Sequence, residues 1–311
     1  MIDLIDFNDC KETYRTYGGN AGRKVAVKYE DFDWILKFPG NLKDYPDINL
    51  DYSISPISEF LGSHIYGHLD IPVHNTILGT FKGKNVVGCK DFCADDKLLS
   101  EFRTYKSTGS YAVSSSTEGD GTSLSEVLDI IDNNQILKQV EDVSKRFWNM
   151  FYVDAFIGNP DRNNGNWGLL VTFPERKIIS LAPVYDNGKS LNSKWDDSRM
   201  RNFLKRASKQ QRIENSSISV YLDKEGKKIR PFQFMMQTEI TECHESIVSL
   251  FEKIDMDSID DLIEEIHKSN LISDLQADFY HILLNNRYDL VLKERYEHSQ
   301  EILSTCHCSL C

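Results

Sequence analysis

The spacing of hydrophobic residues predicts a β-rich region at the start of the chain. Short alternating runs at 25–29 and 34–38 flank the acidic turn "EDFD", an arrangement typical of a hairpin. A second hairpin is predicted for 72–81 and 84–92, on either side of a turn at "KGK". Between the two hairpins, residues 55–69 carry hydrophobic residues at helical spacing. The first ninety residues are therefore expected to form a small sheet with one helix.

The next region changes from a polar segment to helical periodicity. Residues 104–122 are rich in Ser, Gly and Thr and are too polar to form a core, so we expect a loop. A capping-box pattern at Ser123 and Glu126 predicts the start of a helix. Apolar residues spaced by threes and fours then predict a long helix over 136–157.

The remainder of the chain adds one hairpin and several helices. Apolar runs at 167–173 and 178–186 are joined by "PERK" and predict the hairpin, and amphipathic helical patterns dominate beyond about residue 195. These elements predict an α+β fold with two lobes. The small β-rich lobe is expected over 1–93 with a hinge at its end, and the larger, mainly helical lobe over 94–311.

Composition and charge exclude several classes of protein. The 311 residues are 40% hydrophobic and 27% charged, which is typical of a globular protein. The net charge of −12 argues against broad nucleic-acid binding, because that function needs a basic surface. No hydrophobic run is long enough to span a membrane, and the N-terminus lacks the features of a secretory signal. We therefore expect a cytoplasmic protein without a membrane span.

The seven cysteines do not suggest a disulfide framework. Their number is odd and four of them are scattered, which favours a reducing compartment. The tail 306–311, "CHCSLC", has ligand types that suit zinc and loosely matches a prenylation box. A chain end with reactive thiols explains the same residues more simply, and the role of the tail stays open.

A polar loop and the end of the third hairpin offer ligands for a metal ion. Asp161 and Asn166 lie five residues apart in "NPDRNNGN", and Asp186 ends the hairpin in "VYDNG". Because a hairpin brings its two ends together, we expect Asp186 near Asn166. A carboxylate and an amide oxygen at one point suit Mg²⁺, which usually sits beside a phosphate. Asp161 would then be available to accept a proton from a hydroxyl.

A lysine in the predicted sheet offers the complementary positive charge. Lys37 lies between two hydrophobic residues in "WILKFP", where a buried lysine would need a carboxylate partner. Glu59, on the predicted helix, faces the right region if that helix packs on the sheet. Taken singly, Lys37 could reach out to water, Glu59 could be a solvated helix residue, and the polar loop could be a plain turn. The order and spacing of all five residues favour a phosphoryl-transfer site.

The same residues resemble those of the HipA-like serine/threonine kinases, over roughly residues 15–295. "WILKFP", "ISEFLGSHIYGHLDIPV", "NPDRNNGN" and "LAPVYD" carry the resemblance. It implies that Lys37 contacts nucleotide phosphates with Glu59 as its partner, and that Asp161 is the catalytic base. It also implies that Asn166 and Asp186 bind Mg²⁺ and that the fold is that of a protein kinase.

Other segments match this family less closely. "CKDF" lies where the family's hinge would hold adenine, which implies that Lys90 and Phe92 bind the nucleotide. "GGNAGRK" only loosely matches the family's phosphate loop, so Gly19 and Gly22 are candidate positions for phosphate binding. Where the family has a catalytic-loop histidine, this chain has Asn163.

The function implied by the resemblance is ATP- and Mg²⁺-dependent transfer of the γ-phosphate to Ser or Thr of a protein substrate. The Ser-rich segment 107–125 is a candidate for self-phosphorylation, with a plain linker as the alternative. Secretion or translocation into other cells is also compatible with the resemblance. Two other functions stay open. One is a phosphoinositide-type lipid or small-molecule kinase, because "DRNNGN" and "VYDNG" also look like the loops of such enzymes. The other is a non-catalytic nucleotide-binding module.

Overall fold

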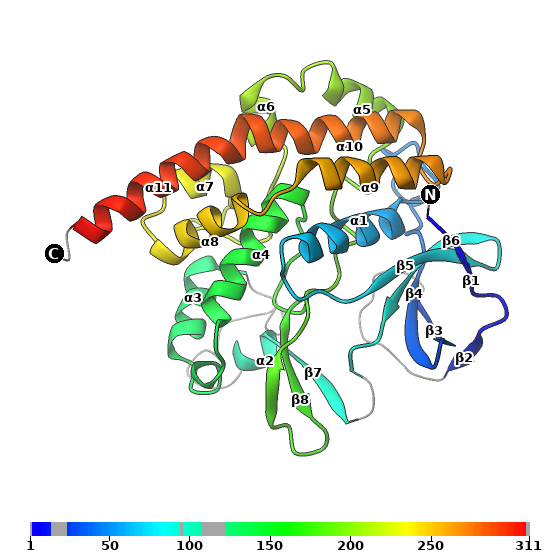
Figure 1. Ribbon diagram of the computed structural model, residues 1–311, viewed down its shortest axis with the longest axis horizontal. Helices are drawn as coiled ribbons and strands as arrows, with labels where there is room; N and C mark the ends of the chain where they lie inside the picture. Colours follow the sequence, from blue (N-terminus) through cyan, green and yellow to red (C-terminus); the bar gives the residue numbers. More distant parts are fainter. Residues whose placement is uncertain (1, 14–23, 94–95, 107–121, 309–311) are drawn as a thin grey trace. The chain divides into compact units, whose positions relative to one another are not determined.

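The structure is a computed structural model that describes residues 2–13, 24–93, 96–106 and 122–308 (Figure 1). Packing divides the chain into two compact units, and each is made of separate segments. The first unit comprises Met1–Ala94, Tyr185–Ala207 and Asp255–Leu283. The second comprises Asp95–Val184, Ser208–Ile254 and Leu284–Cys311. The functional division into lobes at residue 93 stays a prediction.

The first unit contains a six-stranded sheet. Its strand order is β1-β5-β6-β4-β3-β2, with β1 parallel to β5 and all other neighbours antiparallel. Both hairpins predicted from the sequence are present, as β3 with β4 and β5 with β6. The strands are β1 (Ile5–Asp6), β2 (Lys11–Thr13), β3 (Lys24–Tyr29), β4 (Phe32–Lys37), β5 (Thr76–Phe81) and β6 (Lys84–Lys90).

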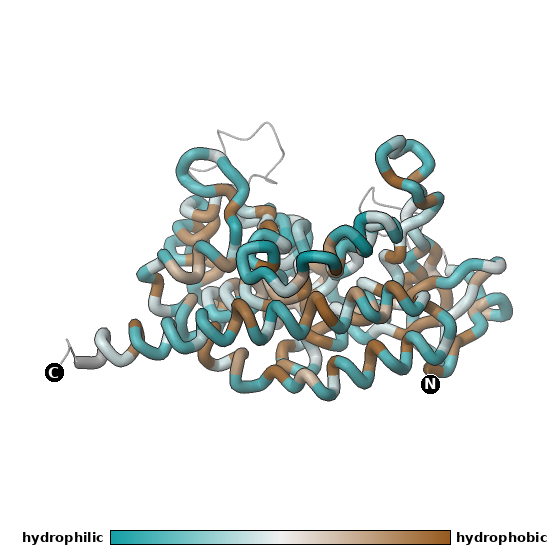
Figure 2. Tube along the Cα trace, turned by 90° about the horizontal axis from the view of Figure 1, so that it is seen from above, coloured by the Kyte–Doolittle hydropathy of each residue, from teal (hydrophilic) through white to brown (hydrophobic). Residues whose placement is uncertain are grey.

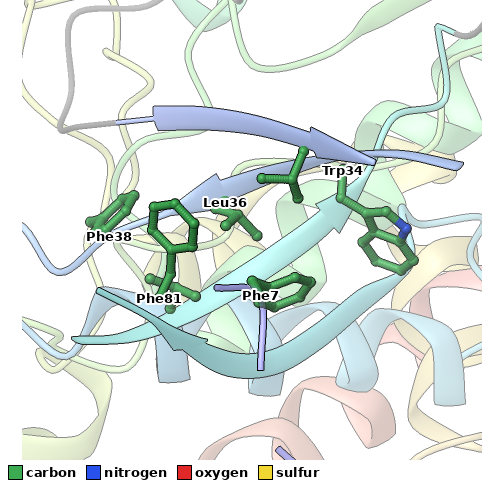
Figure 3. Packing of buried hydrophobic residues seen from close by; sticks show 7 residues of the cluster. Phe7, Trp34, Leu36, Phe38 and Phe81 are labelled. Carbon is green, nitrogen blue, oxygen red and sulfur yellow. The ribbon is translucent and has the colours of Figure 1, made fainter. Parts of the chain in front are cut away.

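Alternation along β4 decides which residues enter the core of the first unit. Trp34, Leu36 and Phe38 are buried and lie with Phe7 and Phe81 in one hydrophobic cluster (Figure 3). Because side chains on a strand point alternately to opposite faces, Lys37 must leave from the other face of the sheet. The hydrophobic pattern of this strand therefore sets the direction of its lysine.

Helix α1 (Ser55–His68) packs against β5 and β6. The predicted helix at 55–69 is thus confirmed, with Pro56 in its first turn, where the missing N–H has no helical partner to lose. Glu59 and Ser63 are four residues apart on α1, so they share one face of the helix. The other helices of this unit are α5 (Asp197–Leu204), α9 (Met256–Lys268) and the first part of α10 (Asp274–Arg287).

The second unit is mainly helical and contains one small sheet. The sheet has the order β7-β8-β9 and includes the third predicted hairpin. Its strands are β7 (Lys97–Glu101), β8 (Gly168–Thr172) and β9 (Ile178–Leu181). The helical elements are α2 (Arg103–Lys106), α3 (Leu124–Asn133), η1 (Leu137–Gln139), α4 (Val143–Ile157), α6 (Gln210–Glu214), α7 (Pro231–Gln237), α8 (Thr241–Phe251), η2 (Tyr288–Leu292) and α11 (Lys293–Cys308).

Hydrophobic and hydrophilic positions alternate along the helices, as Figure 2 shows. In α9, for example, Ile259, Ile263 and Ile266 are buried, and they recur at spacings of four and three residues. In the second unit, α4 packs against α8. None of the helices in the described part of the chain is long and apolar enough to cross a membrane.

One local prediction was wrong, and a second was right only in part. The helix expected over 136–157 begins only at Val143, because Asn134 Oδ1 accepts hydrogen bonds from the N–H groups of the next turn and Asp142 has a left-handed backbone (φ 61°). Helix α3 begins at Leu124 with Ser123 as its N-cap residue, as the pattern predicted, but the side-chain hydrogen bonds of a capping box do not form. Ser123 makes no side-chain cap, and Glu126 accepts a hydrogen bond from Lys106 Nζ at 2.9 Å instead.

Candidate active site

Lys37 lies between two carboxylates in the first unit. Its Nζ is 2.9 Å from Glu59 Oε2 and 2.9 Å from Asp186 Oδ1. The Glu59 side chain is 1% exposed and that of Asp186 is 39% exposed. The lysine on β4 thus meets the glutamate on α1, the pairing expected from the sequence, and the functional role of the pair stays a prediction.

Electrostatics favour the charged form of all three groups. Burial alone would lower the pKa of Lys37, but the neighbouring carboxylates of Asp186 and Glu59 hold that pKa well above its usual value. Burial likewise opposes ionisation of Glu59, and Lys37 and His74 outweigh it, so the pKa of Glu59 is lowered. Lys37 also lowers the pKa of Asp186. A charged lysine is the form that can attract phosphate oxygens.

The backbone around Asp186 fixes the second carboxylate. Asp186 has a left-handed conformation (φ 62°), which is unusual for a residue other than glycine and is often found at functional sites. The next residue, Asn187, donates its backbone N–H to Glu59 Oε1 at 3.0 Å. Gly188 is close enough that an added Cβ would lie 3.0 Å from Glu59 Oε2. The "DNG" segment is therefore fitted closely around Glu59.

Glu59, His74 and Cys89 bring their ligand atoms within 4.8 Å of one another. They could hold a metal ion by type, but both Glu59 oxygens already accept hydrogen bonds, Oε2 from Lys37 and Oε1 from Asn187. Burial also raises the pKa of the Cys89 thiol, so it stays protonated and is a poor ligand. We interpret these three residues as part of the buried ion-pair cluster around Lys37.

The polar loop of the second unit begins where α4 ends. Gly158 caps this helix in a left-handed conformation (φ 67°), which glycine adopts without strain. The backbone N–H of Asp161 donates to the side-chain oxygen of Asn159 at 3.1 Å. Asn163 accepts a hydrogen bond on Oδ1 from the N–H of Gly165 at 2.9 Å. Asn163 thus shapes the turn, as is common for asparagine.

A buried ion pair between Asp154 and Arg162 anchors this loop. Arg162 Nε and Nη2 lie 2.9 and 3.1 Å from the two carboxylate oxygens of Asp154, which makes a two-pronged ion pair. A third nitrogen, Nη1, donates to the Asn166 carbonyl at 3.0 Å. Arg162 is 2% exposed and Asp154 6% exposed. The buried pair therefore fixes both ends of the segment that runs from Asp161 to Asn166.

Asn166 is held to Asp161 through its side-chain amide nitrogen. Its Nδ2 donates to the Asp161 carbonyl at 2.7 Å and lies 3.3 Å from Asp161 Oδ2. With the nitrogen so placed, the amide oxygen points away from Asp161 and can serve as a hard ligand. An amide oxygen and the partly exposed carboxylate of Asp186 match the chemistry of Mg²⁺. Asn166 belongs to the second unit and Asp186 to the first, so the magnesium site that they were expected to share stays a prediction.

The segment expected to bind adenine is held by backbone hydrogen bonds. The N–H of Lys90 donates to the Asn75 carbonyl and that of Asp91 to the Asp33 carbonyl, both at 2.9 Å. The side chain of Lys90 lies over the ring of Phe32. The backbone N–H groups of Lys90 and Asp91 are thus used within the protein. Of the two residues expected to contact the nucleotide, Lys90 and Phe92, Phe92 is therefore the better candidate.

Several expectations concern residues outside those that the structure describes. Gly19 and Gly22 lie there, as does most of the Ser-rich segment 107–125. The side chains of the tail 306–311 are also not described. The expected roles of these residues stay predictions.

Two residues that contact the expected site residues were not predicted from the sequence. His74 lies 3.0 Å from Glu59, and Arg162 lies at the centre of the loop, yet neither was singled out. A sequence signal existed for Arg162, which follows Asp161 directly in the family-like "DRNNGN". For His74 there was none, because a lone histidine before a strand is more often a core residue.

The chain is similar to known proteins over nearly its whole length. The family model of the HipA-like C-terminal domain matches residues 17–259. Serine/threonine-protein kinase CtkA of Helicobacter pylori strain J99 is 30% identical over 303 residues, which cover 97% of this chain and 90% of that protein. A crystal structure of the Helicobacter pylori proinflammatory kinase CtkA matches with a TM-score of 0.87 and 30% identity. It covers 96% of this chain and 99% of the other, which confirms the predicted α+β fold.

Proposed function

The chain belongs to the HipA-like C-terminal domain family, and we propose that it is a protein kinase that transfers the γ-phosphate of ATP to serine or threonine. The observation that carries this proposal is the ion pair between the partly exposed Lys37 and the buried Glu59, with Asp186 on the same lysine. A serine/threonine kinase with 30% identity over nearly the whole chain supports the same conclusion.

Lys37 would bind the phosphates of the nucleotide. Its ammonium group is bound by Glu59. Because Glu59 is almost fully buried, its carboxylate has little freedom to move, and it keeps the ammonium group in one position. Asp186 is 39% and Lys37 19% exposed, so a phosphate could reach the ammonium group from the solvent. A fixed charge of this kind lowers the barrier because it needs no rearrangement when the phosphoryl group moves.

Asp161 would accept the proton of the attacking hydroxyl. In the proposed reaction the hydroxyl oxygen bonds to the γ-phosphorus, the bond to the leaving ADP oxygen breaks, and the proton goes to the Asp161 carboxylate. The loop supports this role because Asn159 and Asn166 both hydrogen bond to Asp161. In such reactions orientation of the hydroxyl contributes more than basicity.

Asn166 and Asp186 would hold Mg²⁺. The ion, when bound, neutralises charge on the phosphate oxygens. Asn166 offers its amide oxygen because its nitrogen is engaged by Asp161. Asp186 keeps its carboxylate ionised through contact with Lys37, which lowers its pKa. Phosphorylation of the chain's own Ser-rich segment 107–125 belongs to the same proposal.

The test is incubation of the purified protein with γ-labelled ATP, Mg²⁺ and a general protein substrate. Asp161→Ala should lower transfer by orders of magnitude, about 10²-fold to 10⁴-fold, while nucleotide still shifts the melting temperature. Full transfer by Asp161→Ala would refute the assigned role. Label on lipid extracts but not on protein would favour the lipid-kinase alternative. A nucleotide-induced shift with no transfer at all would favour the non-catalytic module.

A further inference from the structure

Four polar residues form a hydrogen-bonded ring next to the Lys37–Glu59 pair, and one of its links is a backbone N–H. His74 Nε2 lies 3.0 Å from Glu59 Oε1 and 3.2 Å from Ser63 Oγ. Asn187 Nδ2 donates to Ser63 Oγ at 3.0 Å, and the Asn187 backbone N–H returns to Glu59 Oε1 at 3.0 Å. All four members belong to the first unit. The ring joins α1, the residues before β5 and the segment after Asp186.

The ring is buried to an unusual degree for polar groups. Ser63, His74, Glu59 and Asn187 are 2%, 5%, 1% and 0% exposed. Burying such groups costs free energy unless every one of them is satisfied, and apolar residues of similar volume often stabilise a fold equally well. Stability alone therefore does not explain the ring. A better explanation is that its hydrogen bonds fix the positions of these four residues.

The ring acts on the oxygen of Glu59 that does not face Lys37. A carboxylate can only accept hydrogen bonds, so His74 Nε2 must carry the proton that it shares with Glu59 Oε1. Ser63 Oγ, at 3.2 Å from the same nitrogen, is then a second acceptor of that single N–H. Lys37 uses the other oxygen, Oε2. With Oε1 fixed by His74 and Asn187, the carboxylate cannot rotate about its last bond, and Oε2 stays aimed at Lys37.

We propose that His74 is a positioning residue for phosphoryl transfer, which acts through Glu59 to hold Lys37 at the nucleotide phosphates. The inference rests on the proposed function. It adds to that function a residue with no contact to substrate, together with Ser63 and Asn187, which complete the ring. Because Asn187 follows Asp186 directly, the same ring also fixes the second carboxylate partner of Lys37.

A double-mutant cycle tests the inference. The variants are His74→Leu, Glu59→Gln and the double variant, with kcat and the KM for ATP measured for each at a temperature well below its melting transition. His74→Leu should lower kcat on the order of 10-fold to 100-fold, because a misplaced catalytic group has effects of this size. In the Glu59→Gln background the same change should lower kcat by no more than about 2-fold, because residues that act through one another are not additive.

Two further variants separate positioning from folding. His74→Gln keeps a side-chain N–H for Glu59 and should transfer phosphate faster than His74→Leu. His64→Leu is the matched control, because His64 lines the same pocket of about 500 Å³ as His74 but hydrogen bonds to the Phe60 carbonyl rather than to Glu59. It should leave kcat unchanged.

The outcomes distinguish the inference from the function on which it rests. If the wild type is active and His74→Leu lowers kcat as much in the Glu59→Gln background as in the wild-type background, the inference alone is overturned. The inference is also overturned if His74→Leu leaves kcat per folded molecule unchanged and lowers only the melting temperature. A wild type without any transfer would overturn the proposed function and the inference with it.

Discussion

Removal of the Arg162 side chain should destabilise the second unit strongly. In Arg162→Ala, the Asp154 carboxylate loses two hydrogen bonds, of 2.9 and 3.1 Å, while it stays in a site where it is 6% exposed. The Asn166 carbonyl loses a third, of 3.0 Å. Breaking a buried ion pair in this way costs about 3–5 kcal/mol, and we expect a loss of about 4 kcal/mol in the free energy of unfolding. This is a large share of the ~5–15 kcal/mol that stabilise most proteins.

The measurement is urea unfolding followed by tryptophan fluorescence, with the slope of the transition compared between variants. Arg201→Ala is the matched control. Arg201 is 63% exposed and lies 4.0 Å from its partner Asp197, and such exposed pairs contribute about 0–1 kcal/mol. The double variant Arg162→Met with Asp154→Leu should regain part of the lost stability, because no charge is then left buried. A loss below about 1 kcal/mol in Arg162→Ala would refute the interpretation of this pair as the anchor of the loop.

Two further predictions concern backbone strain and thiol chemistry. Gly158→Ala should destabilise the protein by at least about 1 kcal/mol, seen as a lower melting temperature, because φ is 67° and the new Cβ would lie 2.8 Å from Arg287 Nη2; an unchanged melting temperature would contradict this. Cys89 should resist alkylation by iodoacetamide in the native protein at pH 8, because burial raises its pKa and a thiol reacts as the thiolate. Peptide mass spectrometry checks this, and modification of Cys89 ahead of the half-exposed cysteines would contradict it.

The sequence predicted what depends on local periodicity. Alternation along β4 was enough to separate Lys37 from the core residues on either side of it. The helix with Glu59 was visible from its apolar face and from Pro56. Together with the order of the polar residues, these patterns led to the pair that the structure contains at 2.9 Å.

Contacts between distant segments could not be predicted in the same way. The ring formed by Glu59, His74, Ser63 and Asn187 depends on hydrogen bonds between residues up to 128 positions apart, and no local pattern records such contacts. Strand β7 was missed because "KLLSE" is short and is stabilised by pairing with β8. The helix predicted over 136–157 was too long because Ile136 lies at helical spacing from the next apolar residues. In the structure Ile136 is 37% exposed and precedes the helix. Tertiary context decided each of these cases.

In the proposed reaction Lys37 holds the phosphates of the nucleotide during transfer to a hydroxyl. The most direct test compares transfer of the γ-phosphate to protein by the wild type, Lys37→Met and Lys28→Met, with nucleotide binding measured in parallel. Lys28 lies on the neighbouring strand β3 and is exposed, so its replacement controls for the loss of one positive charge. We predict that Lys37→Met loses transfer by about 10²-fold or more, while Lys28→Met keeps the rate of the wild type. Equal rates in all three proteins would contradict this role of Lys37.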